Sequence, residues 1–176
     1  MLETHEIYEA FESSRHVVVF PGDCLDLLRT IPDGAIQLVV TSPPYNIGKE
    51  YETRLDLQAY LAQQAQVIRE CVRVLSPQGS ICWQVGNYVD NGAIIPLDTI
   101  LYLVFRDLGL KMRNRIIWHF EHGLHCSNRF SGRYETIMWY TKTKDYVFNL
   151  DPVRVPQKYP GKKHFKGPKR GELSGN

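Results

Sequence analysis

The stretch AIQLVVTSPPYN, residues 35–46, places an apolar segment directly before two prolines. The near-continuous apolar run is typical of a strand that is buried on both faces of a parallel sheet. Pro43 and Pro44 have no backbone N–H and fix φ, so the chain has to leave the sheet there in a stiff, extended turn. We expect this turn to hold Ser42 and Tyr45 in set directions at the carboxyl end of the strand.

Around this strand, hydrophobic patterns predict alternating strands and helices. Strands are expected at residues 16–20, 35–40, 80–86, 111–120 and 136–142. Helices are expected at residues 25–31, 55–75 and within 94–109. This order predicts a doubly wound α/β sheet, with one antiparallel strand among the last two. Ligands of such sheets bind beyond the carboxyl ends of the strands, which would bring residues 21–23, the SPPY turn (42–45) and the segment after Val85 to one edge.

Composition favours a single ordinary domain. The chain has 176 residues, of which 43% are hydrophobic. The polar N-terminus, MLETHEIYEAFESS, predicts no signal peptide, and no apolar run reaches the roughly 20 residues that span a bilayer. We therefore expect a cytoplasmic protein without membrane contact. The cysteines lack paired spacing, so reduced thiols are expected at Cys24, Cys71, Cys82 and Cys126.

Positive charge is concentrated near the C-terminus. Residues 152–171 contain seven basic and no acidic residues, although the net charge of the chain is only +2. Such a segment is either a solvated, disordered tail or a phosphate-contacting arm. Tyr159, His164 and Phe165 favour the second interpretation, because rings can stack on bases. The candidate nucleic-acid contacts in this segment are Lys158, Lys162, Lys163 and Lys166.

The SPPY turn offers groups that suit a planar base with an exocyclic amine. The Ser42 hydroxyl and the Pro43 carbonyl can accept the two N–H bonds of the amine, and the Tyr45 ring can stack on the base. Accepting these hydrogens raises the electron density on the amine nitrogen, which makes it a better nucleophile. The nucleotide has to be flipped out of a duplex first. Alternatively, the prolines only end the strand.

Several ordered blocks resemble one enzyme family. TSPPYNIGKEYE, with GDCLDLL upstream and VRVLSPQGSICWQVGN downstream, resembles the N4-cytosine and N6-adenine DNA methyltransferases of the circularly permuted class. RNRIIWHFEHGLHC, RFSGRYETIMWYTK and the basic segment continue the likeness. The resemblance implies a Rossmann-like, S-adenosylmethionine-dependent methyltransferase sheet. It also implies that Ser42, Pro43, Pro44 and Tyr45 form the catalytic motif.

The resemblance further implies a cofactor contact at residues 23–24. Asp23 would bind the adenosine part of S-adenosylmethionine, with Cys24 beside it. Asp23 also stands where a helix cap is expected, and the two roles are compatible. Because the sulfonium supplies an activated methyl group, the protein mainly has to align the reactants and polarise the amine.

One departure from the family matters. The permuted class carries a Phe-x-Gly-x-Gly cofactor motif toward its C-terminus, and this sequence contains none. The strands that go with it lie between those expected at residues 16–20 and 35–40, so the latter would have an uncovered edge. We expect a partial catalytic region at 1–151 and, at 152–176, a basic segment leading toward an absent target-recognition region. The chain would then pair with a second chain, self-associate or be a truncation.

The segment HFEHGLHC, residues 119–126, is not expected to bind a metal, because no second pair of ligands supports its histidines and cysteine. A loop that contacts DNA is favoured there, with Arg129 and Arg133 as phosphate contacts. Serine at position 42 favours cytosine N4 over adenine N6, since the adenine enzymes more often have aspartate. Two alternatives stay open: an amino-methyltransferase for RNA or protein, and a DNA-binding module or inactive remnant.

Overall fold

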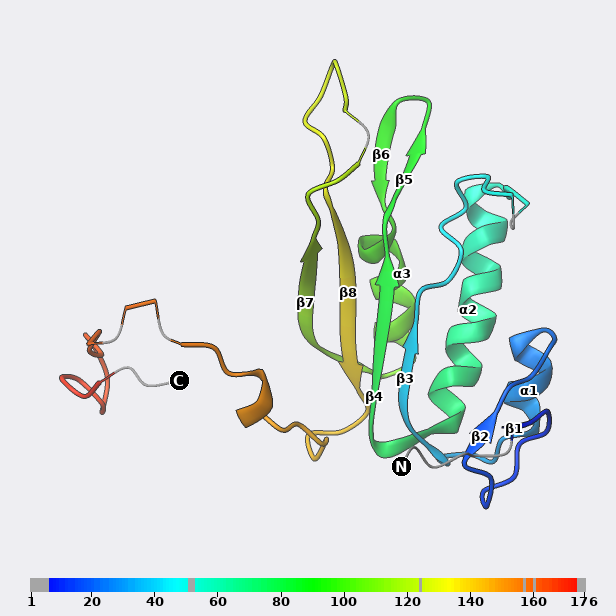
Figure 1. The fold of residues 1–176 in the computed structure, drawn as a ribbon, viewed down its shortest axis with the longest axis horizontal. Coiled ribbons are helices and arrows are strands. Elements are labelled where there is room, and N and C mark those ends of the chain that lie inside the picture. The colour runs from blue at the N-terminus through cyan, green and yellow to red at the C-terminus, as the bar shows by residue number, and fades with distance from the viewer. Residues whose placement is uncertain (1–6, 51–52, 124, 157, 160, 174–176) are drawn as a thin grey trace, which may run out of the picture. The chain divides into compact units, whose positions relative to one another are not determined.

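Four strands form the central sheet, in the order β3-β4-β8-β7 (Figure 1). Their bounds are β3 (Ile36–Thr41), β4 (Leu75–Val85), β7 (Lys111–His119) and β8 (Tyr134–Thr141). β3 and β4 are parallel, whereas β8 is antiparallel to both of its neighbours. The expected α/β class and the antiparallel strand near the end of the sheet are therefore confirmed.

This computed structural model describes residues 7–50, 53–123, 125–156, 158–159 and 161–173. Its contacts divide the chain into two units, Met1–Tyr146 and Val147–Asn176. The sheet belongs to the first unit. The boundary expected at residue 151 falls inside the second unit, and the functional division into a catalytic region and a basic segment stays a prediction.

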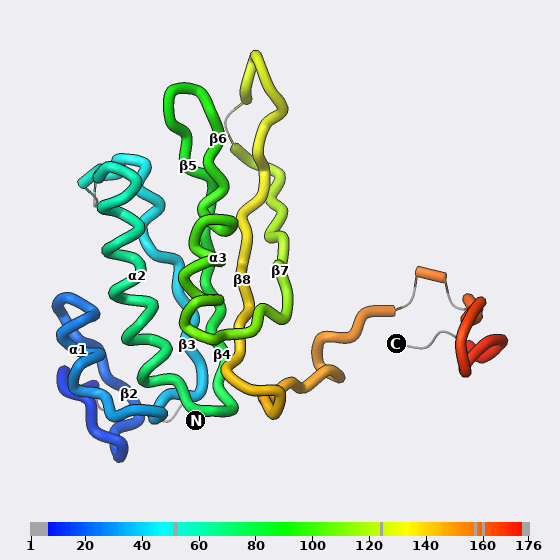
Figure 2. The backbone as a smooth tube through the Cα atoms, turned by 180° about the vertical axis from the view of Figure 1, so that it is seen from behind, coloured from blue at the N-terminus to red at the C-terminus, as the bar shows by residue number. Residues whose placement is uncertain are grey.

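Helices α2 (Leu57–Val74) and α3 (Leu97–Asp107) pack on one face of the sheet (Figure 2). α2 begins at Asp56, whose carboxylate accepts hydrogen bonds from the amides of Gln58 and Ala59. In the core, the Phe105 ring of α3 stacks on Tyr140 of β8, with ring centroids 4.2 Å apart. Both helices fall inside the ranges that hydrophobic periodicity predicted.

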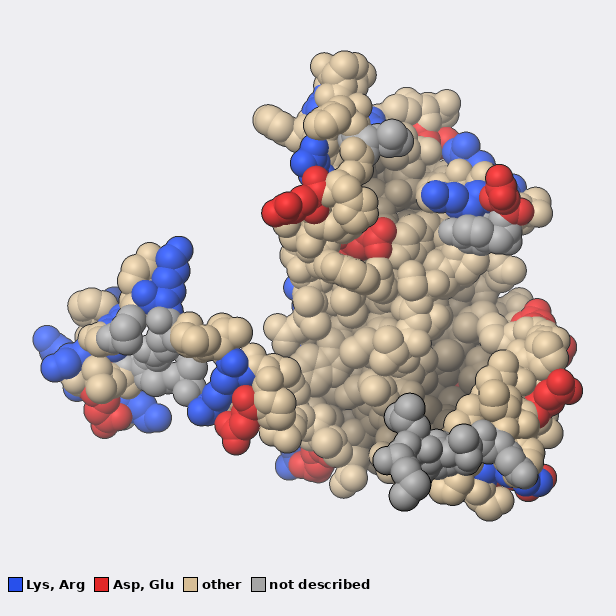
Figure 3. Space-filling view, in the orientation of Figure 1, with Lys and Arg blue, Asp and Glu red and all other residues tan. Residues whose placement is uncertain are grey.

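In the described part of the first unit, no helix packs on the opposite face of the sheet. Side chains alternate between the two faces of a strand, and Leu38 and Val40 of β3 point away from the helices, with exposed fractions of 57% and 70%. Figure 3 looks onto this open face and shows uncharged atoms across its centre. The expectation that β3 is buried on both faces is wrong for these residues, because both sheet-packing helices, α2 and α3, lie on the other side.

A hairpin that the sequence analysis missed extends β4. Strands β5 (Asn87–Asp90) and β6 (Ala93–Pro96) pair antiparallel around Asn91 and Gly92. Both turn residues have positive φ, 46° and 83°. Asn-Gly between two strands is the sequence signal of such a turn, so the hairpin was predictable.

The N-terminal segment forms its own small layer. β2 is limited to Val17–Val18 and pairs with β1 (Ile7–Tyr8) in a separate sheet, so the strand expected at residues 16–20 does not join the central one. Helix α1 (Cys24–Thr30) packs on α2. The Arg73 guanidinium of α2 donates to the carbonyls of Leu28 and Ile31, which fixes the end of α1.

The second unit contains the short 3-10 helix η1 (Asp151–Val153) and a loop closed by local bonds. There the His164 amide donates to the Glu172 carbonyl at 3.0 Å. Its described residues are exposed. Across the described part of the chain, no helix has both the length and the apolar character of a membrane span.

Candidate active site

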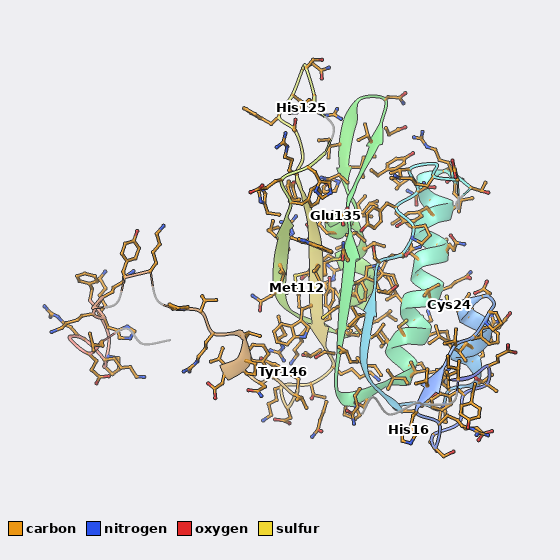
Figure 4. The ribbon with its side chains drawn as sticks, in the orientation of Figure 1. His16, Cys24, Met112, His125, Glu135 and Tyr146 are labelled. Carbon is orange, nitrogen blue, oxygen red and sulfur yellow. The ribbon has the colours of Figure 1, made fainter. Side chains whose placement is uncertain are left out.

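A cavity of about 620 Å³ lies at the carboxyl end of β3. All four residues of the SPPY turn line it, so the structure brings the predicted catalytic motif to one hollow. The other residues that line it are Ile47, Lys49, Gln84 and Glu135. Figure 4 labels Glu135 beside the upper part of the sheet, where the space-filling view shows acidic atoms in a hollow (Figure 3).

Buried polar contacts fix the backbone of the turn. The Tyr60 hydroxyl, from α2, donates to the Pro44 carbonyl at 2.9 Å. Asn46 is buried with a φ of 61°, and its side chain exchanges two hydrogen bonds with the backbone of Leu55, at 2.7 and 2.8 Å. Asparagine tolerates this left-handed conformation better than most residues. The chain therefore enters and leaves the SPPY turn along a set path.

A chain of hydrogen bonds crosses the cavity wall. The Ser42 and Tyr45 hydroxyls lie 2.9 Å apart, and the Tyr45 hydroxyl donates to Glu135 Oε2 at 3.0 Å. The Gln84 amide donates to the same Oε2 at 2.5 Å. Three strands thus position the residues of this hydrogen-bond chain: Ser42 follows β3, Gln84 lies on β4 and Glu135 lies on β8.

Gln84 and Glu135 were not predicted from the sequence. Glu135 is ninety positions from Tyr45 in the chain, and no local motif marks it. Strand alternation was the one usable signal, because it places Gln84 and Glu135 on the face of the sheet that carries Ser42.

Gly86 makes room for the Tyr45 ring. A Cβ atom at position 86 would lie 3.0 Å from the ring atoms Cδ2 and Cε2 of Tyr45. The expectation that the segment after Val85 meets the SPPY turn is therefore confirmed. The absence of a side chain at residue 86 lets the ring pack against the start of the β5–β6 hairpin.

The Tyr45 phenol is held in its protonated form. Burial raises the pKa of Tyr45, and the Glu135 carboxylate that accepts its proton raises it further. The bond from Ser42 acts in the opposite direction, since it stabilises the phenolate. The phenol therefore stays a hydrogen-bond donor at neutral pH.

Asp23 and Cys24 lie at the start of α1 and do not line this cavity. Asp23 caps the helix, because its Oδ1 accepts the Leu25 amide at 2.8 Å. Burial, followed by the nearby Asp23 carboxylate, raises the pKa of the Cys24 thiol. Residues 21–23 were expected at the same edge as the SPPY turn. The structure separates them, because β2 is not a strand of the central sheet; the adenosine contact stays a prediction.

The two predicted arginine contacts brace the loop before β8. Arg133 donates to the Glu121 carbonyl at 2.8 Å, and Arg129 donates to the Gly92 carbonyl of the β5–β6 turn at 3.3 Å. These bonds order the loop, and the phosphate-binding role stays a prediction. The same holds for Lys158, Lys162, Lys163 and Lys166, which lie in the second unit. Within the described ranges, no group of His, Cys, Asp and Glu side chains is placed to hold a metal ion.

Comparison with known proteins identifies the family. The family model described as DNA methylase, of the N6/N4 methyltransferases, matches residues 36–175. The chain belongs to this DNA methylase family. The matched range includes the SPPY turn, Gln84 and Glu135.

Several relatives share this similarity. The chain is 55% identical over 159 residues to the type II methyltransferase M.BglII of Bacillus subtilis, covering 90% of this chain and 44% of that protein. It is 31% identical over 145 residues to the DNA adenine methyltransferase YhdJ of Escherichia coli K12, covering 80% and 46%. The chain thus spans about half the length of these relatives.

Solved structures share the fold. The TTHA0409 protein of Thermus thermophilus, solved with S-adenosyl-L-methionine, is 29% identical with a TM-score of 0.60, over 77% of this chain and 61% of that one. The PvuII DNA methyltransferase, described as cytosine-N4-specific, gives a TM-score of 0.62 at 23% identity, over 72% and 49%. These matches confirm the methyltransferase fold class.

Proposed function

We propose that this chain carries the target-base site of a DNA amino-methyltransferase that modifies the exocyclic amine of a flipped base. The observation that carries the proposal is the cavity built by the SPPY turn, in a chain of the DNA methylase family. A volume of about 620 Å³ is within the range of small-molecule sites. A nucleobase that has left its duplex is a ligand of that size class.

The oxygens of the SPPY turn have different hydrogen-bond partners. Tyr60 already donates to the Pro44 carbonyl, so the Pro43 carbonyl and the Ser42 hydroxyl are the acceptors proposed for the amine. Accepting its two N–H bonds would orient the nitrogen lone pair and raise its nucleophilicity. The Tyr45 ring, packed at Gly86, would stack on the base.

The methyl donor that we propose is S-adenosylmethionine, which supplies an activated methyl group on a sulfonium. The TTHA0409 structure contains this compound. Asp23, the residue proposed to contact the adenosine part of this compound, caps α1 through Oδ1 and does not line the SPPY cavity. Alignment by the SPPY turn is then the main task of this chain, because the donor is already activated.

For the target base, we favour cytosine N4 over adenine N6, because serine stands first in the SPPY turn. The test is mass spectrometry of nucleosides from the DNA of cells that express the complete system. N4-methylcytosine is expected with the wild-type chain and is expected to vanish with Ser42→Ala. N6-methyladenine in its place would overturn the choice of base. No methylated amino base at all would overturn the proposed function.

We also propose that a complementary polypeptide of the same family covers the open face of the sheet. Among the described residues, β3 has one strand neighbour, and the open face exposes large apolar side chains. They include Leu38, Val40, Ile116 and Trp118. Such a face and edge are normally covered. The relatives are about twice as long as this chain, and we propose that a segment from their additional length covers this face, which favours a complement over a second copy.

Light scattering coupled to size exclusion tests this partner. The chain alone is expected to show the mass of one copy, and a one-to-one complex is expected when the remaining part of a family-length relative is added. Val40→Lys, on the open face, should weaken that complex. A stable dimer of this chain alone, unaffected by the added segment, would contradict the proposal.

A further inference from the structure

The direction of each hydrogen bond in the cavity wall follows from counting protons. Tyr45 has one hydroxyl proton, and it goes to Glu135 Oε2 at 3.0 Å. An ionised carboxylate only accepts, and Gln84 donates to the same oxygen. The Tyr45 oxygen can therefore meet the Ser42 hydroxyl, 2.9 Å away, only as an acceptor.

Ser42 must then donate its own proton to Tyr45. A serine hydroxyl has one proton and two lone pairs. With the proton committed to the phenol, the Ser42 oxygen presents lone pairs alone to the cavity. The effects on the pKa of Tyr45 agree with this order: burial raises it most, the bond from Ser42 lowers it, and the bond to Glu135 raises it.

Packing and backbone pairing hold the residues at both ends of this hydrogen-bond chain in place. Gly86 lies against the Tyr45 ring, and Tyr60 holds the Pro44 carbonyl. Glu135 is half-buried on β8, whose pairing with β4 through Val85 and Thr136 sets it beside Gln84. The direction of the chain is therefore decided by the chemical type of residue 135, an acceptor that cannot donate.

We propose that Glu135 determines specificity by fixing Ser42 as a pure hydrogen-bond acceptor, so that the site takes a base with an exocyclic amine and rejects its oxo counterpart. The inference rests on the proposed function, because it assumes that the base amine meets Ser42. Cytosine and adenine present donors at this point, whereas uracil and hypoxanthine present a carbonyl oxygen that would face the lone pairs of Ser42. The repulsion between the carbonyl oxygen and the Ser42 oxygen, neither of which finds a donor in the other, is the source of the selectivity.

The first variant is Glu135→Leu, which removes the acceptor. Tyr45 and Gln84 both donate to Glu135 Oε2, so a glutamine whose amide oxygen took that position would keep both bonds, whereas leucine keeps neither. Without an acceptor at position 135, the phenol proton can turn to Ser42, and the Ser42 proton can turn into the cavity. Tyr45→Phe is the second variant: it keeps the ring and cuts the chain of bonds. Glu121→Leu, at an exposed carboxylate outside the cavity, is the matched control.

The experiment compares binding of oligodeoxycytidylate and oligodeoxyuridylate of equal length by fluorescence anisotropy, with a parallel arm of oligodeoxyadenylate and oligodeoxyinosinate. The wild type and Glu121→Leu are expected to prefer the amine partner of at least one pair by about tenfold. Glu135→Leu and Tyr45→Phe should reduce that preference to about threefold or less. Thermal melting confirms that each variant is folded.

The two possible failures are distinguishable. If the wild type prefers the amine and both variants keep the full preference, the role of Glu135 is overturned and the proposed function stands. If the wild type binds amine and oxo oligonucleotides equally in both arms, the site does not read an amine, and both proposals fall.

Discussion

Along β4, Ile81, Trp83 and Val85 are sealed against the helices, whereas Cys82 and Gln84, at alternate positions, face the open side. The helix side carries the aromatic core, and the open side carries the Ser42–Tyr45–Glu135–Gln84 chain. The same strands therefore supply stability on one face and the candidate chemistry on the other. Substitutions on the helix side should therefore lower the stability of the protein, whereas substitutions on the open side should lower its activity and leave its stability nearly unchanged.

The largest effect is expected on the helix side. Phe105 is fully buried and stacks on Tyr140, so Phe105→Ala should lower the free energy of unfolding by about 3–5 kcal/mol. Val40→Ala, on the open face, should change it by less than about 0.5 kcal/mol in the isolated chain. Urea denaturation measures both values. Equal losses from the two variants would show that the open face is already covered.

The second-largest effect is expected at alkaline pH, which should lower the free energy of unfolding through a buried thiol on the helix side. Burial raises the pKa of Cys71 on α2 from 9.0 to about 12. Between these values the folded protein keeps a proton that the unfolded chain has lost, so stability falls as pH rises, by up to about 1.4 kcal/mol per pH unit. Cys71→Ala should make the fall in stability with pH shallower. Some of the fall should remain, because burial also raises the pKa of Tyr140. The Cys126→Ala control should follow the wild type; a Cys71→Ala curve of unchanged slope would refute the account.

A smaller effect is expected where the open face meets the SPPY turn. In Gly86→Ala, the new Cβ would meet the Tyr45 ring at 3.0 Å and shift it by a few tenths of an ångström. We expect about a tenfold fall in methyl transfer with an unchanged melting temperature. Gly132→Ala, where no atom beyond the adjacent residues lies within 4 Å of the added carbon, is the control. A wild-type rate in Gly86→Ala would mean that the ring position is not critical.

The smallest effect concerns the basic segment. If the open face reads the base and this segment only attracts phosphates, each of Lys162→Ala, Lys163→Ala and Lys166→Ala should weaken DNA binding modestly. Each should also lower the slope of log affinity against log salt by about 0.9. Lys111→Ala on β7 is the control. Salt titrations that leave the slope unchanged for all three lysines would exclude them from phosphate contact.

Local patterns predicted the helices, the strands of the central sheet and the SPPY turn, whereas the β5–β6 hairpin and β1 were not predicted. The three- and four-residue spacing of apolar residues predicted a helix at 55–75, and α2 spans Leu57–Val74. Diproline after an apolar run predicted the stiff exit from β3. These features depend on neighbours in sequence, which is why they can be read without a structure.

The partners of the turn could not be predicted in the same way. Glu135 reaches Tyr45 only because β8 pairs with β4 in one register, and a shift of one residue would turn its side chain to the core. Residues 16–20 looked like a sheet strand, yet the described chain gives Val17–Val18 the neighbour β1 alone. Strand pairing between segments that are separated in the sequence determined both the position of Glu135 and the sheet to which Val17–Val18 belongs.

The most direct test of the central claim is methyl transfer from labelled S-adenosylmethionine to DNA by Ser42→Ala, measured with the complementary polypeptide present. Ser80→Ala, on the same face and outside the cavity, is the matched control. The account predicts that Ser42→Ala lowers the rate by about a hundredfold or more while Ser80→Ala keeps the wild-type rate. Equal rates for wild type and Ser42→Ala would contradict it.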